Sequence, residues 1–201
     1  MKKEKSFAAH LFMASGDYIS INLFNLMLVP MVTHWYNNSS FCISLYDGGF
    51  AIGAMIFVTF VVPLSKKLGT SNSAFSGLLI QAILFLLLIL SRNPVMTLFI
   101  MLTFGAANSF SVAIFTSNLQ KRCIGPIKGR VSSAKNFIVS CFSIILIPII
   151  SRLHDISITY GLIASSGIIL TYSIFSFILG RKFVFGREYL TKNVTVHKIE
   201  I

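Results

Sequence analysis

The stretch of the sequence that decides the fold is residues 118–135, Asn118-Leu-Gln-Lys-Arg-Cys-Ile-Gly-Pro-Ile-Lys-Gly-Arg-Val-Ser-Ser-Ala-Lys135. It contains five of the seventeen basic residues of the chain and no acidic residue, and the segments on both sides are almost entirely apolar. A run of positive charge between two membrane-length apolar segments is typical of a cytoplasmic loop. We therefore interpret this stretch, the basic bridge, as a cytoplasmic loop that fixes the side of every other loop.

The composition excludes an ordinary soluble protein. The chain is 55% hydrophobic and 11% charged, whereas a soluble domain carries about 25% charged residues. The net charge of +11 would indicate nucleic-acid binding only if the basic residues gathered on one folded face. They are instead distributed over the loops, so the expected partner is the lipid bilayer with its anionic headgroups, and no nucleic acid. The three cysteines have neither metal-ligand nor redox spacing, and we expect no metal or other cofactor.

Six segments are long and apolar enough to cross the membrane, since a helix needs about 20 residues to span about 30 Å of hydrocarbon. They are residues 11–33, 42–64, 74–90, 95–117, 136–151 and 157–179. The predicted fold class is an all-α integral membrane protein with a bundle of six transmembrane helices. Residues 1–10 would form a cytoplasmic N-terminus, 11–180 the transmembrane domain and 181–201 a basic cytoplasmic tail. The short outer loops predict that consecutive helices pack as antiparallel hairpins.

The distribution of basic residues predicts the orientation. Fifteen of the seventeen Lys and Arg residues lie in the N-terminus, in the 65–73 loop, in the basic bridge or after Gly180. The alternate loops contain only Arg92 and Arg152. Because positively charged loops remain in the cytoplasm, both termini are expected inside the cell, in a multi-pass protein of the inner or plasma membrane.

Two loops at corresponding places, after the second and fourth expected spans, resemble motifs of one transporter family. The first reads Pro63-Leu-Ser-Lys-Lys-Leu-Gly69 and the second is the basic bridge. In the major facilitator superfamily (MFS) the first loop carries Gly-x-Leu-Ala/Ser-Asp-Arg-x-Gly-Arg-Arg. Four residues match that pattern: Leu64, Ser65, Lys67 and Gly69. Four depart from it: Val62, Lys66, Thr70 and Ser71.

The basic bridge resembles the family segment Gln-x-x-(small)-Pro-x-x-x-Gly-Arg-Val-x-Ser. The matching residues are Gln120, Gly129, Arg130, Val131 and Ser133. Over about residues 8–182 the chain is similar to the carboxy-terminal six-helix half of an exporter-like MFS transporter. The resemblance implies a structural or gating role for Lys67, Gly69, Gln120, Gly129 and Arg130. Lys66 stands where the family has an acid, so a clasp through that acid is missing, and the alternative is that these residues only orient the chain.

Polar residues inside the apolar segments are candidates for the solute or proton pathway. An ionised carboxylate in mid-bilayer costs about 2.5–3.5 kcal/mol on insertion scales, so Asp17 needs a protein partner or water. Asn25 follows two turns later on the first span. The first and fourth helices of an MFS half line the translocation cavity, so the resemblance implies pathway roles for Asp17, Asn25 and Asn108, with Gln81 as a further candidate. The alternative is that Asp17 snorkels to the cytoplasmic interface.

The sequence argues against an enzyme. Asp17 and Asp47 would be the pair required by an intramembrane aspartyl protease, but their expected depths differ by well over about 10 Å, so they cannot share a proton. The chain contains no His-Glu-x-x-His, no Gly-x-Ser-x-Gly and no Walker loop. We therefore expect no catalytic and no metal-binding residue.

Together these features predict secondary active transport, a proton-coupled efflux of a small or drug-like solute. Alternating access in this family needs two six-helix halves, so a second half is expected as a separate chain or as another copy of this one. The alternative is a truncated or accessory membrane protein without transport activity of its own.

Overall fold

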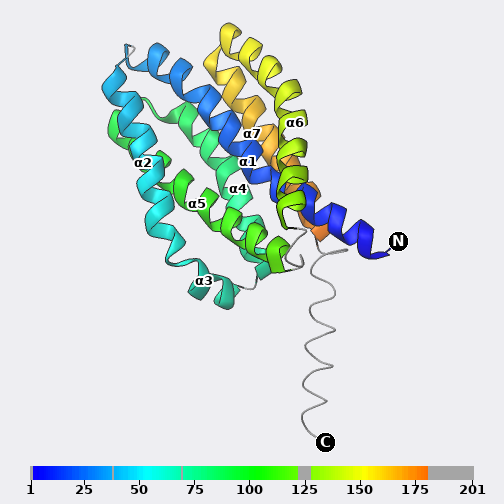
Figure 1. Cartoon of the computed structure of the whole chain (residues 1–201). Helices are drawn as coiled ribbons and strands as arrows, with labels where there is room; N and C mark the ends of the chain where they lie inside the picture. Colours follow the sequence, from blue (N-terminus) through cyan, green and yellow to red (C-terminus); the bar gives the residue numbers. More distant parts are fainter. Residues whose placement is uncertain (1, 38, 69, 122–127, 181–201) are drawn as a thin grey trace, which may run out of the picture.

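The computed structural model describes residues 2–121 and 128–180 apart from residues 38 and 69, with the backbone alone for 2–7, 9, 66–68, 70–74, 121 and 180. This part of the chain contains no strand and folds into seven helices (Figure 1). They are α1 (Lys2–Trp35), α2 (Ser40–Val58), α3 (Val61–Leu68), α4 (Thr70–Leu90), α5 (Pro94–Lys121), α6 (Lys128–Ile156) and α7 (Ile158–Gly180).

Five of these helices contain a segment long and apolar enough to cross a membrane. The segments are His10–Trp35, Ser40–Val58, Pro94–Gln120, Lys128–Ile156 and Ile158–Leu179, and the described apolar part of α4, Phe75–Leu90, is shorter. Within hydrocarbon every backbone N–H and C=O must bond inside the protein, which a helix achieves within one segment. The all-helical fold is therefore that of a membrane-embedded bundle, as the composition predicts.

The expected second span, 42–64, is split by a turn at Thr59 and Phe60, where α2 ends before α3 begins. Pro63 explains the break, because it has no N–H to donate to the Thr59 carbonyl and its ring crowds that oxygen. At this turn the Phe60 amide donates to the Phe57 carbonyl, three residues back, at 3.0 Å. The prediction of one continuous helix to residue 64 was therefore wrong.

The other expected spans lie within longer helices, except that the last one begins at Ile158 and not at Ser157. The span predicted at 136–151 belongs to α6, so the second part of the basic bridge is helical. Residues 2–10 belong to α1, and the expected boundary between an N-terminal segment and the transmembrane domain is not a break in the helix. The tail predicted at 181–201 lies outside the described residues.

Local sequence sets the starts of two helices. At α2 the Ser39 hydroxyl accepts a hydrogen bond from the Cys42 amide at 3.3 Å, as an N-cap residue does. At α5 the Asn93 side chain accepts from the Val95 amide at 2.9 Å. Pro94 takes the first helical position between them, where its missing N–H leaves no donor unpaired.

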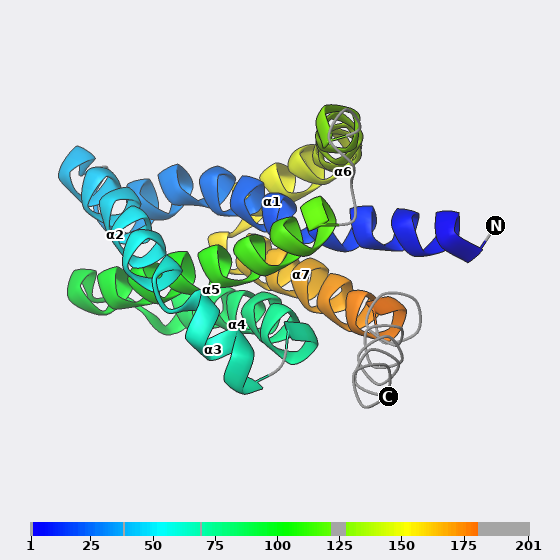
Figure 2. The same cartoon turned by 60° about the horizontal axis from the view of Figure 1, so that its bottom comes forward.

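Helix α1 lies inside the bundle and contacts each of the other long helices. The main pairs are α2 with α5, α4 with α5, α4 with α7, α1 with α6, and α1 with α7. Helices α2 and α6 lie at opposite edges of the bundle in both views (Figures 1 and 2). The expected hairpin packing is confirmed for α4–α5 and α6–α7. It was wrong for α1 and α2, which follow each other in the chain but share little contact.

Glycines explain the close packing of α2 on α5. A Cβ at Gly53 would overlap the backbone carbonyl of Leu102, and one at Gly105 would overlap that of Phe50. One turn before Gly53, a Cβ at Gly49 would lie 2.6 Å from Leu98 Cδ1. Small residues at such positions let two helix backbones approach closely in a membrane. The Gly-x-x-x-Gly pair of α2 is thus used inside this chain.

The helix ends that adjoin the basic loops gather at one end of the bundle. Figure 1 shows the start of α1, helix α3, the end of α5 and the start of α6 at its lower end. At the other end the Tyr36 hydroxyl lies 2.7 Å from Thr97 Oγ1, and the Arg92 guanidinium lies 4.8 Å from the centroid of the Trp35 ring. These contacts tie the end of α1 to the turn between α4 and α5.

Candidate functional site

A buried acid forms the centre of the candidate site. Asp17, on α1, is 0% exposed, as are Gln81 on α4 and Ser111 on α5, while Asn108 on α5 is 4% exposed. An isolated buried carboxylate is very costly, so it must be hydrogen-bonded or neutralised. The residues around Asp17 supply hydrogen bonds from two other helices.

The network converges on one carboxyl oxygen. Gln81 donates from Nε2 to Asp17 Oδ1 at 3.1 Å, and the Ser111 hydroxyl donates to the same oxygen. The Asn108 amide donates to Gln81 Oε1 at 3.2 Å and to the Asp17 backbone carbonyl at 3.3 Å. The Gln81 amide also reaches Ser111 Oγ at 3.4 Å. Helices α1, α4 and α5 are therefore joined at a single acidic group.

The other carboxyl oxygen of Asp17, Oδ2, lies outside this network. Asp17 Oδ2 is buried and has no hydrogen-bond partner among the described residues, and the same holds for the Ser20 hydroxyl one turn further along α1. Next to Asp17, the Tyr18 ring lies under the ammonium of Lys135 from α6, with Nζ 3.6 Å from the ring centroid. Lys135 is close enough for its charge to attract that of Asp17. Oδ2 is thus a buried carboxyl oxygen that accepts no hydrogen bond from the described residues.

A tyrosine of α7 closes the same region of α1. Tyr172 donates its hydroxyl to the Phe12 carbonyl and stacks on the Phe12 ring, with centroids 4.7 Å apart. Gly16 makes room for that ring, because a Cβ there would overlap it. Helix α7 is therefore fixed against α1 one turn before Asp17.

Not all predicted pathway residues meet here. Asp17, Gln81 and Asn108 are brought together, but Asn25 is exposed on the outer surface of the chain. Asp47, the other acid considered from the sequence, is exposed on α2.

The predicted loop residues are spread over the end of the bundle that bears the basic loops. Gln120 is exposed near the end of α5, and Gly129 and Arg130 are exposed in the first turn of α6. A Cβ at Gly129 would meet no atom within 4 Å, so packing does not require a glycine there. The Lys67 side chain and Gly69 lie outside the described residues.

Lys135 is the residue near the site that the sequence analysis did not single out. It was counted as part of the basic bridge, the expected cytoplasmic loop, yet it is 7% exposed. Its spacing carried a signal: Val131, Lys135 and Val139 follow one another at intervals of four, which places them on one face of a helix, and all three are buried.

Comparisons of this chain with protein-family models, with curated proteins and with solved structures find no match.

Proposed function

We propose that this chain is a six-helix unit of a secondary transporter of the MFS type, which exports a small solute in exchange for protons. The observation that carries the proposal is Asp17, an acid buried in the interior of an apolar bundle with one oxygen unbonded among the described residues. Ionisable groups inside membrane proteins are costly and mark proton or substrate pathways. The six spans of the proposal are α1, α2 with α3, α4, α5, α6 and α7.

The pairing of helices supports this kind of unit. Taking α1, α2 and α4 as one triplet and α5, α6 and α7 as a second, α1 packs on α6 as α5 packs on α2. In this scheme α1 corresponds to α5, α2 to α6 and α4 to α7. The contact of α1 with α7 therefore corresponds to that of α5 with α4, and the contact of α4 with α7 corresponds to itself. The corresponding helices α1 and α5 start at opposite ends of the bundle (Figure 1). Two inverted three-helix repeats of this kind are nested in each half of an MFS transporter.

A second six-helix unit remains part of the proposal, and the exposure of Asn25 is an additional reason for it. Asp17 and Asn108, for which the resemblance implies positions at a cavity between two halves, are both buried within this chain. Among the predicted pathway residues, Asn25 alone is exposed. An amide facing hydrocarbon lacks hydrogen-bond partners, so a second unit is expected to cover this part of α1.

A second candidate function is a membrane protein that assembles with a transporter but does not transport. The observation that favours it is the closure of the polar network. Gln81, Ser111 and Asn108 are all bonded to Asp17 or to one another within the chain, which is also how a network that only joins α1, α4 and α5 would be built. Such networks specify helix packing.

The transport proposal is tested with purified protein in liposomes under an imposed proton gradient. We expect solute flux only when two six-helix units are present, measured together with the particle mass in detergent. Gradient-driven flux from a single copy, a species of 22.3 kDa, would contradict the need for a second unit. Absence of flux in every pairing would favour the accessory function.

The cytoplasmic position of the basic loops is tested with single cysteines in a cysteine-free background. Ser40→Cys places a thiol at the exposed start of α2, and Gly129→Cys places one in open space at the start of α6. In intact cells a membrane-impermeant maleimide should label Ser40→Cys within minutes and label Gly129→Cys only after permeabilisation. The native Cys42 is a poor reporter because it is buried. The opposite labelling pattern would invert the proposed orientation.

A further inference from the structure

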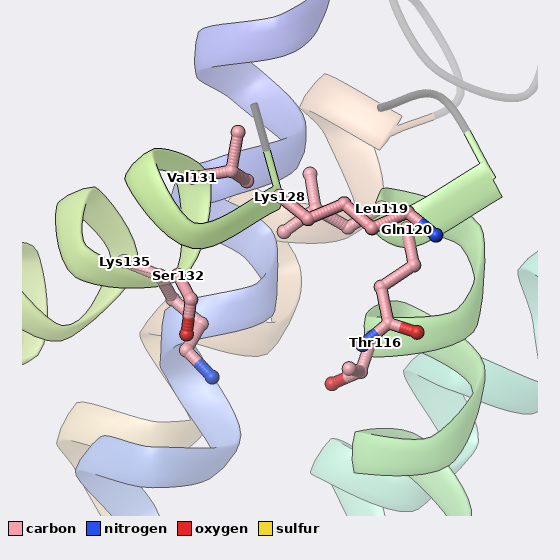
Figure 3. Close-up of a pocket in the computed structure, with 7 residues that line it drawn as sticks. All are labelled: Thr116, Leu119, Gln120, Lys128, Val131, Ser132 and Lys135. Atoms are coloured by element: carbon pink, nitrogen blue, oxygen red, sulfur yellow. The ribbon is translucent and has the colours of Figure 1, made fainter. Parts of the chain in front are cut away.

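A hollow of about 60 Å³ lies between the end of α5 and the start of α6 (Figure 3), and its lining includes Lys135, the lysine that also lies on the Tyr18 ring next to Asp17. Its polar lining consists of Thr116 and Gln120 on α5, and Lys128, Ser132 and Lys135 on α6. Figure 3 shows Ser132 and Lys135 extending from α6 toward the side of α5 that carries Thr116. Lys128 reaches across the upper part toward Gln120.

The lining offers donors and positive charge. Two lysines are among the lining residues, and no acid is. Lys135 is 7% exposed, so most of its side chain is held away from water at the hollow, with its ammonium on the Tyr18 ring. The Thr116 hydroxyl is buried and has no hydrogen-bond partner among the described residues. The lining therefore offers ammonium groups and a hydroxyl to an anion.

The backbone adds to this charge. Lys128, Val131 and Ser132 belong to the first turns of α6, a helix of 29 residues. The first N–H groups of a helix have no partner within it, and its start carries a partial positive charge that attracts anions. The hollow therefore combines a helix start with two ammonium groups.

We propose that this hollow binds a phosphate group, and that the phosphate is the headgroup of an anionic phospholipid. Lys135 lies seven residues, about 10 Å, along α6 from its start, at the border of the apolar run where headgroups meet hydrocarbon. The hollow also has an apolar wall, formed by Leu119 and Val131. Basic pockets between helices at the cytoplasmic interface bind anionic headgroups in this way. The site does not depend on transport.

The proposal is tested by native mass spectrometry of the purified full chain with an equimolar mixture of phosphatidylglycerol and phosphatidylcholine. Wild type should retain phosphatidylglycerol preferentially. Lys128→Gln should weaken that preference about fivefold, the value of one basic residue near an anionic surface. Lys135→Gln should weaken it further. If Lys135→Gln does not fold, the lipid preference of Lys128→Gln alone decides the test, because Lys128 is exposed and its substitution does not disturb the packing.

The matched control is Arg130→Gln, an exposed basic residue of the same turn that does not line the hollow. It should leave the lipid preference unchanged. An equal loss in Arg130→Gln would mean that the whole basic surface attracts the lipid, and would overturn the site. Glycerol phosphate is added at the same concentration in a parallel arm. Displacement of the lipid by this soluble phosphate would assign the hollow to a free phosphate compound and overturn the lipid part of the proposal.

Discussion

Gly53→Leu is expected to prevent the folded bundle from forming, whereas Gly48→Leu in the same helix is tolerated. A Cβ at Gly53 would lie far closer to the Leu102 carbonyl oxygen than van der Waals contact allows, and this backbone atom cannot move aside without shifting α5. At Gly48 a Cβ would meet no atom within 4 Å. Both substitutions add the same apolar side chain to α2, so insertion into the membrane is equally favourable.

The measurement is the yield of monodisperse protein by size-exclusion chromatography after extraction in mild detergent. Gly53→Leu should give aggregate and Gly48→Leu a wild-type peak. Gly53→Ala adds one methyl group at the same contact and is expected to lower the free energy of unfolding by about 1–3 kcal/mol, the usual cost of overpacking. Equal behaviour of the two leucine variants would show that α2 does not rest on α5 through its glycines.

Asp17→Asn is expected to abolish proton-driven transport while leaving the protein folded. The asparagine Oδ1 still accepts from Gln81 and Ser111, which lie at the bonded oxygen of Asp17. What the amide cannot do is release a proton or carry the charge that attracts Lys135. The comparison is initial flux in liposomes under a pH gradient, normalised to the amount of monodisperse protein.

Asp47→Asn is the control, since it removes the same charge from an exposed position on α2. It should transport as wild type does. Asp17→Leu separates the two roles of the network, because it removes the acceptor as well as the charge and leaves the donors of Gln81 and Ser111 unpaired. Wild-type flux in Asp17→Asn together with unfolding of Asp17→Leu would establish a purely structural network.

The parts of the fold that follow from composition were predictable. Each apolar run becomes a helix because hydrocarbon leaves the backbone no other partner, and the basic residues lie where the runs end. The break at Pro63 was also readable, since the missing N–H acts within one turn. The prediction missed this break because residues 42–64 were assigned to one span from the length of the apolar run alone.

Which helices pack together was not readable in the same way. The fit of Gly53 against Leu102 depends on two segments far apart in the chain, and apolar runs of similar composition do not specify their partners. The partners of Asp17 could not be predicted for the same reason. The sequence shows that a buried acid needs hydrogen-bond donors, but here the donors come from residues 64 and 94 positions further along the chain. Asn25 lies away from the Asp17 network, because eight residues advance about 80° past a full number of turns.

The weak contact between α1 and α2 has a consequence for synthesis. These two helices are synthesised before α5, α6 and α7, yet the surfaces that hold them belong to those three helices. Until α5 has been synthesised, Gly49 and Gly53 of α2 have no helix to pack against. Over the same interval Asp17 lacks the hydrogen bond from Ser111. The early chain is thus a pair of separate spans whose acid is without its hydroxyl donor, and it is in this interval that a membrane chaperone or a quality-control protease would meet it.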